Sequence, residues 1–207
     1  MPERLFPTTR LEAFSDGVLA VIITIMVLEL KVPLRDGIAG LISIAPTLFV
    51  YMLSFAFTSI YWVNHHHLIG RVQQCDHRVL YANLTFLFAI SLLPFFTAYV
   101  IEKGSDSFSV ALYAASMIFI AACFFFLRLA IGRLLRQSGD LSSEDTATQR
   151  KHILSLALYL AAIPLAHFHP HVALGAILLQ TIVWIIPTAR TDNYPHTSSR
   201  HTPPGAQ

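Results

Sequence analysis

Long runs of apolar residues alternate with short polar segments along most of the chain. A helix that crosses the hydrocarbon core of a bilayer needs about 20 mostly apolar residues. Six runs reach or approach that length, so the pattern predicts an all-α, polytopic membrane protein with six transmembrane helices. The predicted spans are residues 14–30, 40–63, 80–101, 108–129, 153–166 and 172–187.

The fifth and sixth runs are short, and only residues 167–171 (His-Phe-His-Pro-His) separate them. They fit either two separate spans or one re-entrant hairpin. Two spans are favoured, because Pro170 can open a new helix at its first turn, where a backbone N–H would have no partner. We therefore expect residues 1–190 to form one six-helix transmembrane domain.

The placement of lysine and arginine predicts the orientation, because cytoplasmic loops of membrane proteins carry an excess of these residues. With a cytoplasmic N-terminus, the outer segments hold only Lys31, Arg35 and Lys103, and the other eleven of the 14 basic residues lie inside. Both termini are then cytoplasmic. The tail, residues 191–207, is rich in Thr, Ser, Pro and His, so it buries too little apolar surface to order itself. We expect it to be disordered.

Composition agrees with a membrane environment. Hydrophobic residues make up 55% of the chain and charged residues 13%, with a mean hydropathy of +0.59, whereas soluble domains carry about 25% charged residues. The formal net charge of +2 gives no indication of nucleic-acid binding. Cys75 and Cys123 lie in different segments and form no metal or redox motif, so we expect buried free thiols.

Asp16 lies at the edge of the first apolar run, where an ionisable group is costly unless it faces protein and finds a partner. One interpretation is that Ser15 and Asp16 only start the helix, because a carboxylate is favourable near a helix N-terminus. The other is a polar contact inside the subunit. Its candidate partners are Arg10, Trp62, His65 and His66.

The same helix carries an apolar stripe. At 100° per residue, Val21, Ile25 and Leu28 lie on one side with Thr24 at its edge, and Asp16 lies about 140° away from Val21. Asp16 and the stripe therefore face different surroundings. Periodicity alone favours lipid or ordinary helix packing around the stripe. The alternative is a symmetry axis, where a ring of apolar side chains narrows a pore and gates it by dewetting.

Three consecutive histidines, residues 65–67, end the second run. Adjacent helical residues point 100° apart, so the three do not converge on one metal ion, and we predict no metal site. We expect His65 or His66 to hydrogen-bond toward Asp16, Trp62 to act as an interfacial anchor, and Asn83 to cap the same network. Pro94 predicts a kink in the third run. No catalytic triad, phosphate loop or pair of catalytic carboxylates can be assembled, so we expect no enzyme.

The residues singled out above resemble a known family. The first helix carries Arg10, Phe14, Ser15, Asp16 and Gly17 at its start, followed by Ile23, Thr24, Val27, Leu28, Glu29 and Leu30. The second and third runs add Trp62, His65, His66, Asn83, Leu84, Leu92, Leu93, Pro94, Phe95 and Thr97. Together these resemble the transmembrane protein 175 family, bacterial relatives of the lysosomal potassium channel of animals. The resemblance extends over about residues 10–190.

The resemblance implies a potassium channel of the bacterial inner membrane without a Thr-Val-Gly-Tyr-Gly filter, and this sequence contains none. It implies a homotetramer of six-helix subunits in the lipid bilayer, with the first helix lining the pore. Val21, Ile25 and Leu28 align with the constriction and Thr24 with a threonine implicated in selectivity. The intrasubunit polar network comprises Arg10, Ser15, Asp16, Trp62, His65, His66 and Asn83. Val21 stands where the family usually has Ile or Leu, so its ring should be wider.

The function expected from the sequence is passive conduction of potassium in preference to sodium, with no cofactor besides the permeant ion. A secondary ion transporter and a proton-permeable leak pathway are the alternatives. A transporter typically shows inverted repeats and helices broken at mid-membrane, and neither is evident in the sequence.

Overall fold

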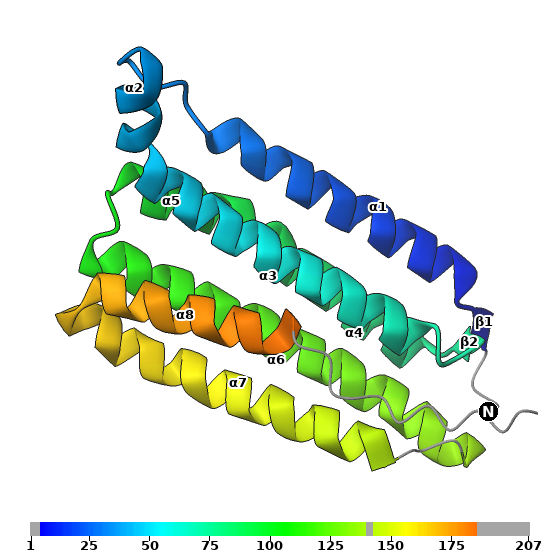
Figure 1. The fold of residues 1–207 in the computed structure, drawn as a ribbon. Helices are drawn as coiled ribbons and strands as arrows, with labels where there is room; N and C mark the ends of the chain where they lie inside the picture. Colours follow the sequence, from blue (N-terminus) through cyan, green and yellow to red (C-terminus); the bar gives the residue numbers. More distant parts are fainter. Residues whose placement is uncertain (1–4, 140–142, 186–207) are drawn as a thin grey trace, which may run out of the picture.

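The computed structural model describes residues 5–139 and 143–185, and within them the chain is almost entirely helical (Figure 1). Two short strands lie at one end of the bundle, β1 (Phe6–Pro7) and β2 (Gln74–Cys75), and a single 3-10 turn, Val27–Glu29, follows the first helix. The helices are α1 (Thr9–Met26), α2 (Gly37–Ser43), α3 (Ala45–Ile69), α4 (His77–Ser91), α5 (Leu93–Glu102), α6 (Ser107–Ser138), α7 (Ser143–Phe168) and α8 (Pro170–Ile185).

Four helical segments are long and apolar enough to cross a membrane: Thr9–Glu29, Ala45–Ile69, His77–Glu102 and Ser107–Ser138. Two shorter apolar helices, Ala157–Phe168 and Pro170–Ile182, coincide with the fifth and sixth apolar runs of the sequence. They pack against each other as α7 and α8 and turn at His169. The chain is therefore a multi-pass membrane protein. The predicted tail, residues 191–207, lies outside the described residues.

The structure divides two of the predicted runs. The third run breaks at Leu92 between α4 and α5, as expected from Pro94, which lacks the N–H needed to continue the helical hydrogen bonds. The second run breaks at Ile44, where α2 ends and α3 begins with Pro46 in its first turn. The sequence analysis treated residues 40–63 as one helix and did not anticipate α2.

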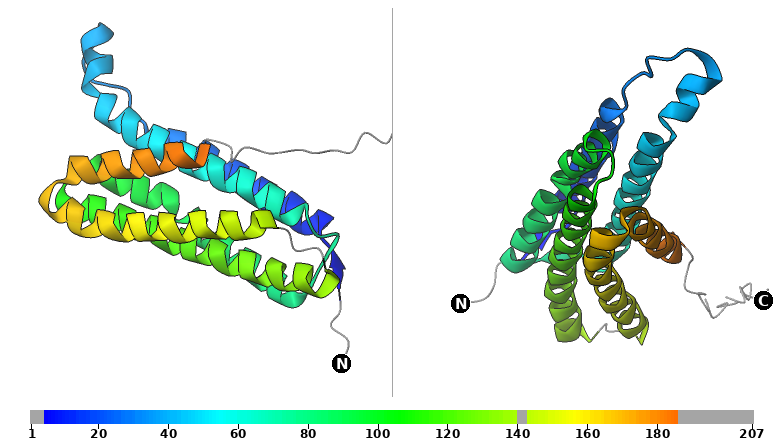
Figure 2. Two further views of the ribbon diagram at one scale, coloured as in Figure 1. Left: turned by 60° about the horizontal axis from the view of Figure 1, so that its bottom comes forward. Right: turned by 90° about the vertical axis from the view of Figure 1, so that its left-hand side faces the viewer.

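The helices form two groups that share α6. On one side α1 packs against α3, α4 and α5, and on the other α6 packs against α7 and α8 (Figure 2). Aromatic rings fill the centre, where the centroid of Phe124 lies 5.1 Å from those of both Tyr61 and Phe86. Because these three rings come from α3, α4 and α6, the core joins the two groups.

A buried hydroxyl cluster adds polar contacts between the helices. Ser54 Oγ on α3 lies 2.8 Å from Thr97 Oγ1 on α5 and 2.7 Å from the Tyr113 hydroxyl on α6. In a membrane interior, hydrogen bonds of this kind between helices favour one packing arrangement.

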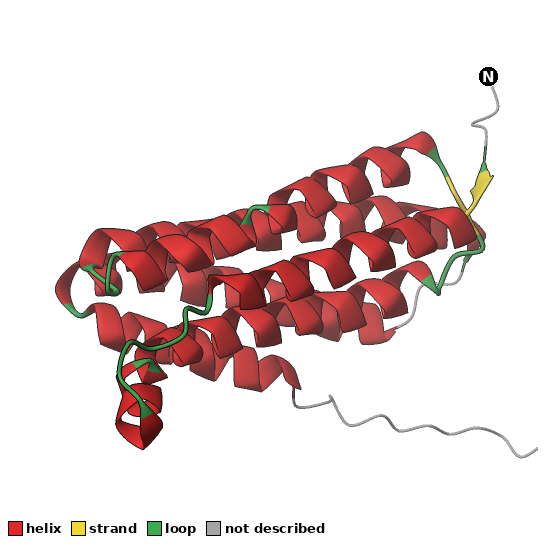
Figure 3. Cartoon of the chain, turned by 90° about the horizontal axis from the view of Figure 1, so that it is seen from above, coloured by secondary structure: helices red, strands yellow, loops and turns green. Residues whose placement is uncertain are grey.

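The two strands connect the start of α1 to the turn between α3 and α4 (Figure 3). They are antiparallel, with Phe6 opposite Cys75, and the Thr8 hydroxyl donates to the Val72 carbonyl at 3.0 Å. We call this the strand end of the bundle and the opposite one the α2 end. Cys75 and Cys123 are free and buried, as predicted. Burial raises the pKa of the Cys75 thiol, which keeps it protonated and unreactive.

Asp76 begins α4 at the strand end and is almost fully buried. Its Oδ1 accepts a hydrogen bond from the Val79 backbone N–H at 2.9 Å, and its Oδ2 lies 3.7 Å from Arg133 Nη1. The side chain therefore caps α4 and pairs with α6.

We expect Asp76→Ala to lower the free energy of unfolding by about 1–2 kcal/mol, because the cap is lost and Arg133 loses a buried partner. Asp76→Asn keeps an oxygen for the cap and loses only the charge. Its free energy of unfolding should therefore lie between those of the unmodified protein and of Asp76→Ala. Thermal unfolding in detergent measures the series. An alanine variant as stable as the asparagine variant would show that the cap contributes nothing.

Candidate functional site

One side of α1 is uncovered in the subunit. Val21 is 54% exposed and Ile25 43%, and Leu28, in the 3-10 turn that continues α1, is 76% exposed. Leu19 and Met26 on the opposite side are fully buried against the bundle. The exposed positions recur every three or four residues, as expected for one side of a helix. α1 thus presents a continuous apolar surface along its length. We call Val21, Thr24, Ile25 and Leu28 the α1 stripe.

Thr24 is the polar member of the α1 stripe. Its hydroxyl donates back to the helix, with Oγ1 lying 2.9 Å from the Val21 carbonyl oxygen and 3.1 Å from that of Ala20. Because the proton points toward the helix, the oxygen lone pairs remain available on the exposed side. Such an oxygen is an acceptor and suits a cation.

The acidic side chains of Glu12 and Asp16 project from the side of α1 that faces α3, away from the α1 stripe. Trp62 Nε1 donates to Asp16 Oδ1 at 2.9 Å, and one helical turn away His66 Nδ1 lies 3.1 Å from Glu12 Oε1. The indole of Trp62 also stacks on the His66 ring. Two positions four residues apart on α1 therefore meet two positions four residues apart on α3, which fixes how the helices are rotated against each other.

Deeper in the bundle, three fully buried side chains form a hydrogen-bonded chain. Asn83 Nδ2 donates to Ser15 Oγ at 2.9 Å, and Ser15 Oγ donates to the Leu11 carbonyl at 2.7 Å. His65 Nε2 lies 2.7 Å from Asn83 Oδ1. An amide oxygen only accepts, so His65 must carry its proton on Nε2. In the neutral ring Nδ1 then carries no proton, and it has no hydrogen-bond partner among the described residues. The chain joins α3, α4 and α1.

Six of the seven residues expected in the polar network fall into two separate groups: Ser15, His65 and Asn83 form one, and Asp16, Trp62 and His66 form the other. Arg10 is the exception. It is exposed and has no hydrogen bond or ion pair within the described ranges 5–139 and 143–185. It lies six residues before Asp16, about 120° around the helix, so its side chain leaves α1 in another direction.

Of the candidate partners of Asp16, Trp62 donates the hydrogen bond to it. His65 or His66 was expected to hydrogen-bond toward Asp16, but both bind other groups. The consecutive histidines point in different directions, His65 toward Asn83 and His66 toward Glu12. In the part of the chain that the structure describes, no group of histidine, cysteine, aspartate or glutamate side chains could hold a metal ion.

Sequence reasoning missed Glu12, and it did not place Phe14 on the exposed side of α1. Phe14 is 56% exposed, and it lies seven residues before Val21, so it extends the α1 stripe toward the strand end. Gly17 lies between them, with open space where a Cβ would project. The same 3.6-residue period that indicated Val21, Ile25 and Leu28 would have placed Phe14 on their side of α1 and Glu12 on the side of Asp16.

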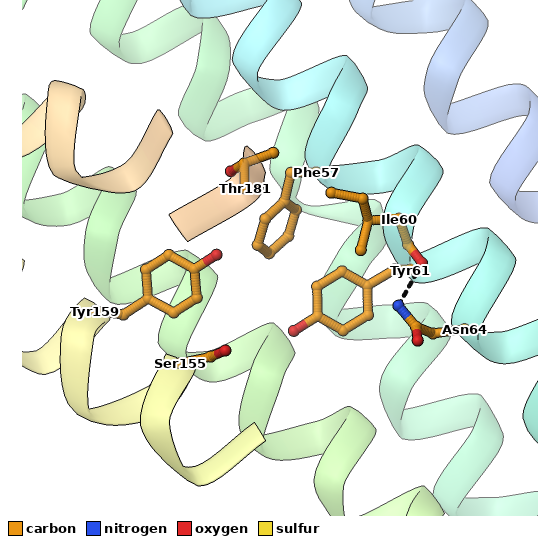
Figure 4. A pocket seen from close by; sticks show the side chains of 7 residues that line it. All are labelled: Phe57, Ile60, Tyr61, Asn64, Ser155, Tyr159 and Thr181. Carbon is orange, nitrogen blue, oxygen red and sulfur yellow. Dashed lines mark hydrogen bonds between the residues drawn. The ribbon is translucent and has the colours of Figure 1, made fainter. Parts of the chain in front are cut away.

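A small pocket, partly open at the surface, lies between α3, α7 and α8 and away from α1 (Figure 4). It is lined by Phe57, Ile60, Tyr61, Asn64, Ser155, Tyr159 and Thr181. Five of these carry hydroxyl or amide groups and none carries a charge. None of its lining residues belongs to α1, so the pocket is separate from the α1 stripe.

Comparison with known proteins gives consistent matches. Residues 10–94 match the family model described as endosomal/lysosomal potassium channel TMEM175. A potassium channel of Chryseobacterium sp. (strain P1-3) is 40% identical over 183 residues, which are 88% of this chain and 95% of that protein. A potassium channel of Chamaesiphon minutus is 32% identical over 193 residues, or 86% of this chain and 94% of that protein.

A solved structure and a human protein are also similar. The crystal structure of a lysosomal potassium-selective channel TMEM175 homologue from Chamaesiphon minutus superposes with a TM-score of 0.73 at 29% identity, covering 86% of this chain and 96% of that chain. Human TMEM175, named an endosomal/lysosomal proton channel, is 29% identical over 175 residues. These are 76% of this chain but only 34% of the human protein.

Proposed function

Because the chain belongs to the TMEM175 family, we propose that it is a potassium channel in which four copies surround a central pore lined by α1. The family consists of channels, so the chain is not an enzyme. The observation that carries the proposal is the orientation of α1. Glu12, Ser15 and Asp16 turn inward to α3 and α4, and the α1 stripe is left exposed along one side. A symmetry axis beside α1 would bury this stripe.

In this proposal α7 and α8 both span the bilayer, which gives six spans per subunit and places both termini on the same side. The excess of arginine in the predicted inner segments supports a cytoplasmic location for that side, the one with the strand end. Because the relatives that are 40% and 32% identical to it come from bacteria, we place the chain in a bacterial inner membrane. Arg133 and Arg136 near the end of α6 would then face the cytoplasm.

The proposed mechanism is passive conduction through an apolar neck. Rings of Ile25 and Leu28 from four copies would exclude most hydrated ions and gate the pore by dewetting. Potassium sheds water at lower cost than sodium, so a narrow apolar neck favours potassium. Thr24 would add four hydroxyl oxygens whose lone pairs face the ion. Selectivity should be weaker than in a carbonyl filter, because no cage of oxygens replaces the full hydration shell.

The proposal is tested by reconstituting the purified protein in liposomes and measuring potassium and sodium flux under defined gradients. We expect fast, downhill potassium flux that exceeds sodium flux and needs no second ion. Flux that appears only with a coupled ion would identify a secondary transporter instead. A pH-sensitive dye inside the same liposomes reports proton flux. Proton flux without potassium flux would show a proton leak pathway and overturn the proposal.

A further inference from the structure

The segment between α1 and α3 carries several uncovered apolar side chains, beside the exposed charged residues Arg35 and Asp36. Val32 is 88% exposed, Leu34 103%, Ile38 77%, Leu41 59% and Ile42 66%. Figures 1 and 2 show α2 turned away from the helix bundle at the end opposite the strands. We call residues 32–43 the elbow. All five side chains are more than half exposed, so their surroundings require an explanation.

The elbow has a fixed shape. A Cβ at Gly40 would lie 1.8 Å from the carbonyl oxygen of Arg35 and 2.8 Å from its carbonyl carbon, and 3.4 Å from a ring carbon of Pro33. Only glycine permits this approach. Gly37 also has a φ of 70°, in the region that favours glycine. The connection therefore folds back on α2 through backbone contacts, which fix the backbone that carries the exposed side chains.

Membrane dimensions place the elbow outside the hydrocarbon core. The 25 residues of α3 extend about 37 Å, more than the roughly 30 Å of the core. α2 precedes α3 and so lies at or beyond the outer boundary of the core. Ile38, Leu41 and Ile42 therefore reach at most the edge of the lipid tails, and water would be an unfavourable surrounding for them.

α2 also lacks the features of a helix that lies flat on a membrane. Such helices have a strongly polar face, rich in lysine and arginine, opposite an apolar one. The α2 sequence, Gly-Ile-Ala-Gly-Leu-Ile-Ser, has Ser43 as its one polar side chain. A helix that is apolar on all sides is normally buried in protein. Protein is therefore the expected cover for the elbow.

We propose that the elbow is an intersubunit clasp that packs against a second copy of this chain at the α2 end of the bundle. This inference rests on the proposed function. The elbow continues directly from α1, whose stripe faces neighbouring copies in the proposed tetramer, so it extends the surface on which the copies meet. The clasp would hold the outer ends of the four α1 helices at a fixed spacing, next to the Leu28 ring.

Photocrosslinking in the reconstituted, full-length protein tests the clasp. A benzophenone amino acid replaces Leu41 in one variant and Leu160 in a matched control. Leu160 is 53% exposed on α7, which packs against α6 and α8 and lies far from α1. We expect crosslinked dimers and higher species from position 41 and none from position 160. Lipid adducts without crosslinked chains at position 41, or equal crosslinking at both positions, would overturn the clasp.

A second measurement does not depend on the bulky amino acid. The double substitution Leu41→Ser with Ile42→Ser should reduce the tetrameric fraction several-fold in native mass spectra, while Leu160→Ser should leave it unchanged. An unchanged tetrameric fraction in the double variant would also overturn the clasp. Flux measured on the same preparations separates the two proposals. Crosslinking at position 41 in a protein without potassium flux would leave the clasp in place and remove the channel.

Discussion

Replacing Ile25 with alanine should raise potassium flux roughly tenfold and bring the ratio of potassium to sodium flux closer to one. Each substitution removes three carbons from the exposed side of α1, and a fourfold assembly would remove them from all four sides of the neck. Water then enters at lower cost. A barrier lower by about 1.4 kcal/mol accounts for a tenfold rise in rate. Flux of both ions into liposomes measures the effect.

Ile23→Ala is the matched control. Ile23 is two residues away on the same helix, about 160° around from Ile25, and it packs against the hydrophobic core. The chemical change is identical, but it falls on the side of α1 that faces the subunit. We expect Ile23→Ala to lower thermal stability and to leave the flux ratio unchanged. If Ile25→Ala left both fluxes as they are in the unmodified protein, the α1 stripe would not line the pathway.

The direction of the α1 stripe depends on contacts made elsewhere. Ser15 binds Asn83 and Asp16 binds Trp62, so two adjacent residues of α1 are held by two different helices, α4 and α3. A helix fixed at two points around its circumference cannot rotate about its axis. The exposed orientation of Val21, Ile25 and Leu28 is therefore a consequence of polar contacts one to three turns away.

Much of this arrangement could be predicted from the sequence because it follows from periodicity. The apolar runs predicted the long helices, and Pro94 predicted the break between α4 and α5. The angle between Asp16 and Val21 predicted that they face different surroundings, as the structure shows. Each of these properties is local to one helix, so no knowledge of how helices pack was needed.

The partners of polar groups could not be predicted in the same way. The choice of Trp62 for Asp16, with His66 on Glu12, depends on the register between α1 and α3. Several registers satisfy the apolar pattern equally well. The elbow was missed for a related reason. The contact between Gly40 and the Arg35 backbone interrupts an apolar run without changing its hydropathy, so the run appeared to be one helix.

Asn83→Leu should lower the free energy of unfolding by about 2–4 kcal/mol. Asn83 is 1% exposed, and its side chain hydrogen-bonds both His65 and Ser15. Leucine has a similar size but neither accepts nor donates, so the Nε2–H of His65 would be left buried without a partner. Each unsatisfied buried group costs about 1–3 kcal/mol. His65 would then have both ring nitrogens unpaired. Thermal unfolding of the detergent-solubilised protein measures the loss.

Asn64→Leu separates this effect from the loss of any asparagine. Asn64 is one residue before His65 but only half-buried, and its Nδ2 donates to the Ile60 carbonyl of its own helix at 2.8 Å. Its removal leaves no other side chain without a partner, so we expect little change in stability.

Because the hydrogen bonds of Asn83 to His65 and Ser15 also orient α1, Asn83→Leu protein that still assembles should conduct with reduced potassium preference. Equal unfolding temperatures for the two variants would show that the chain from His65 to Ser15 does not hold α1 in place.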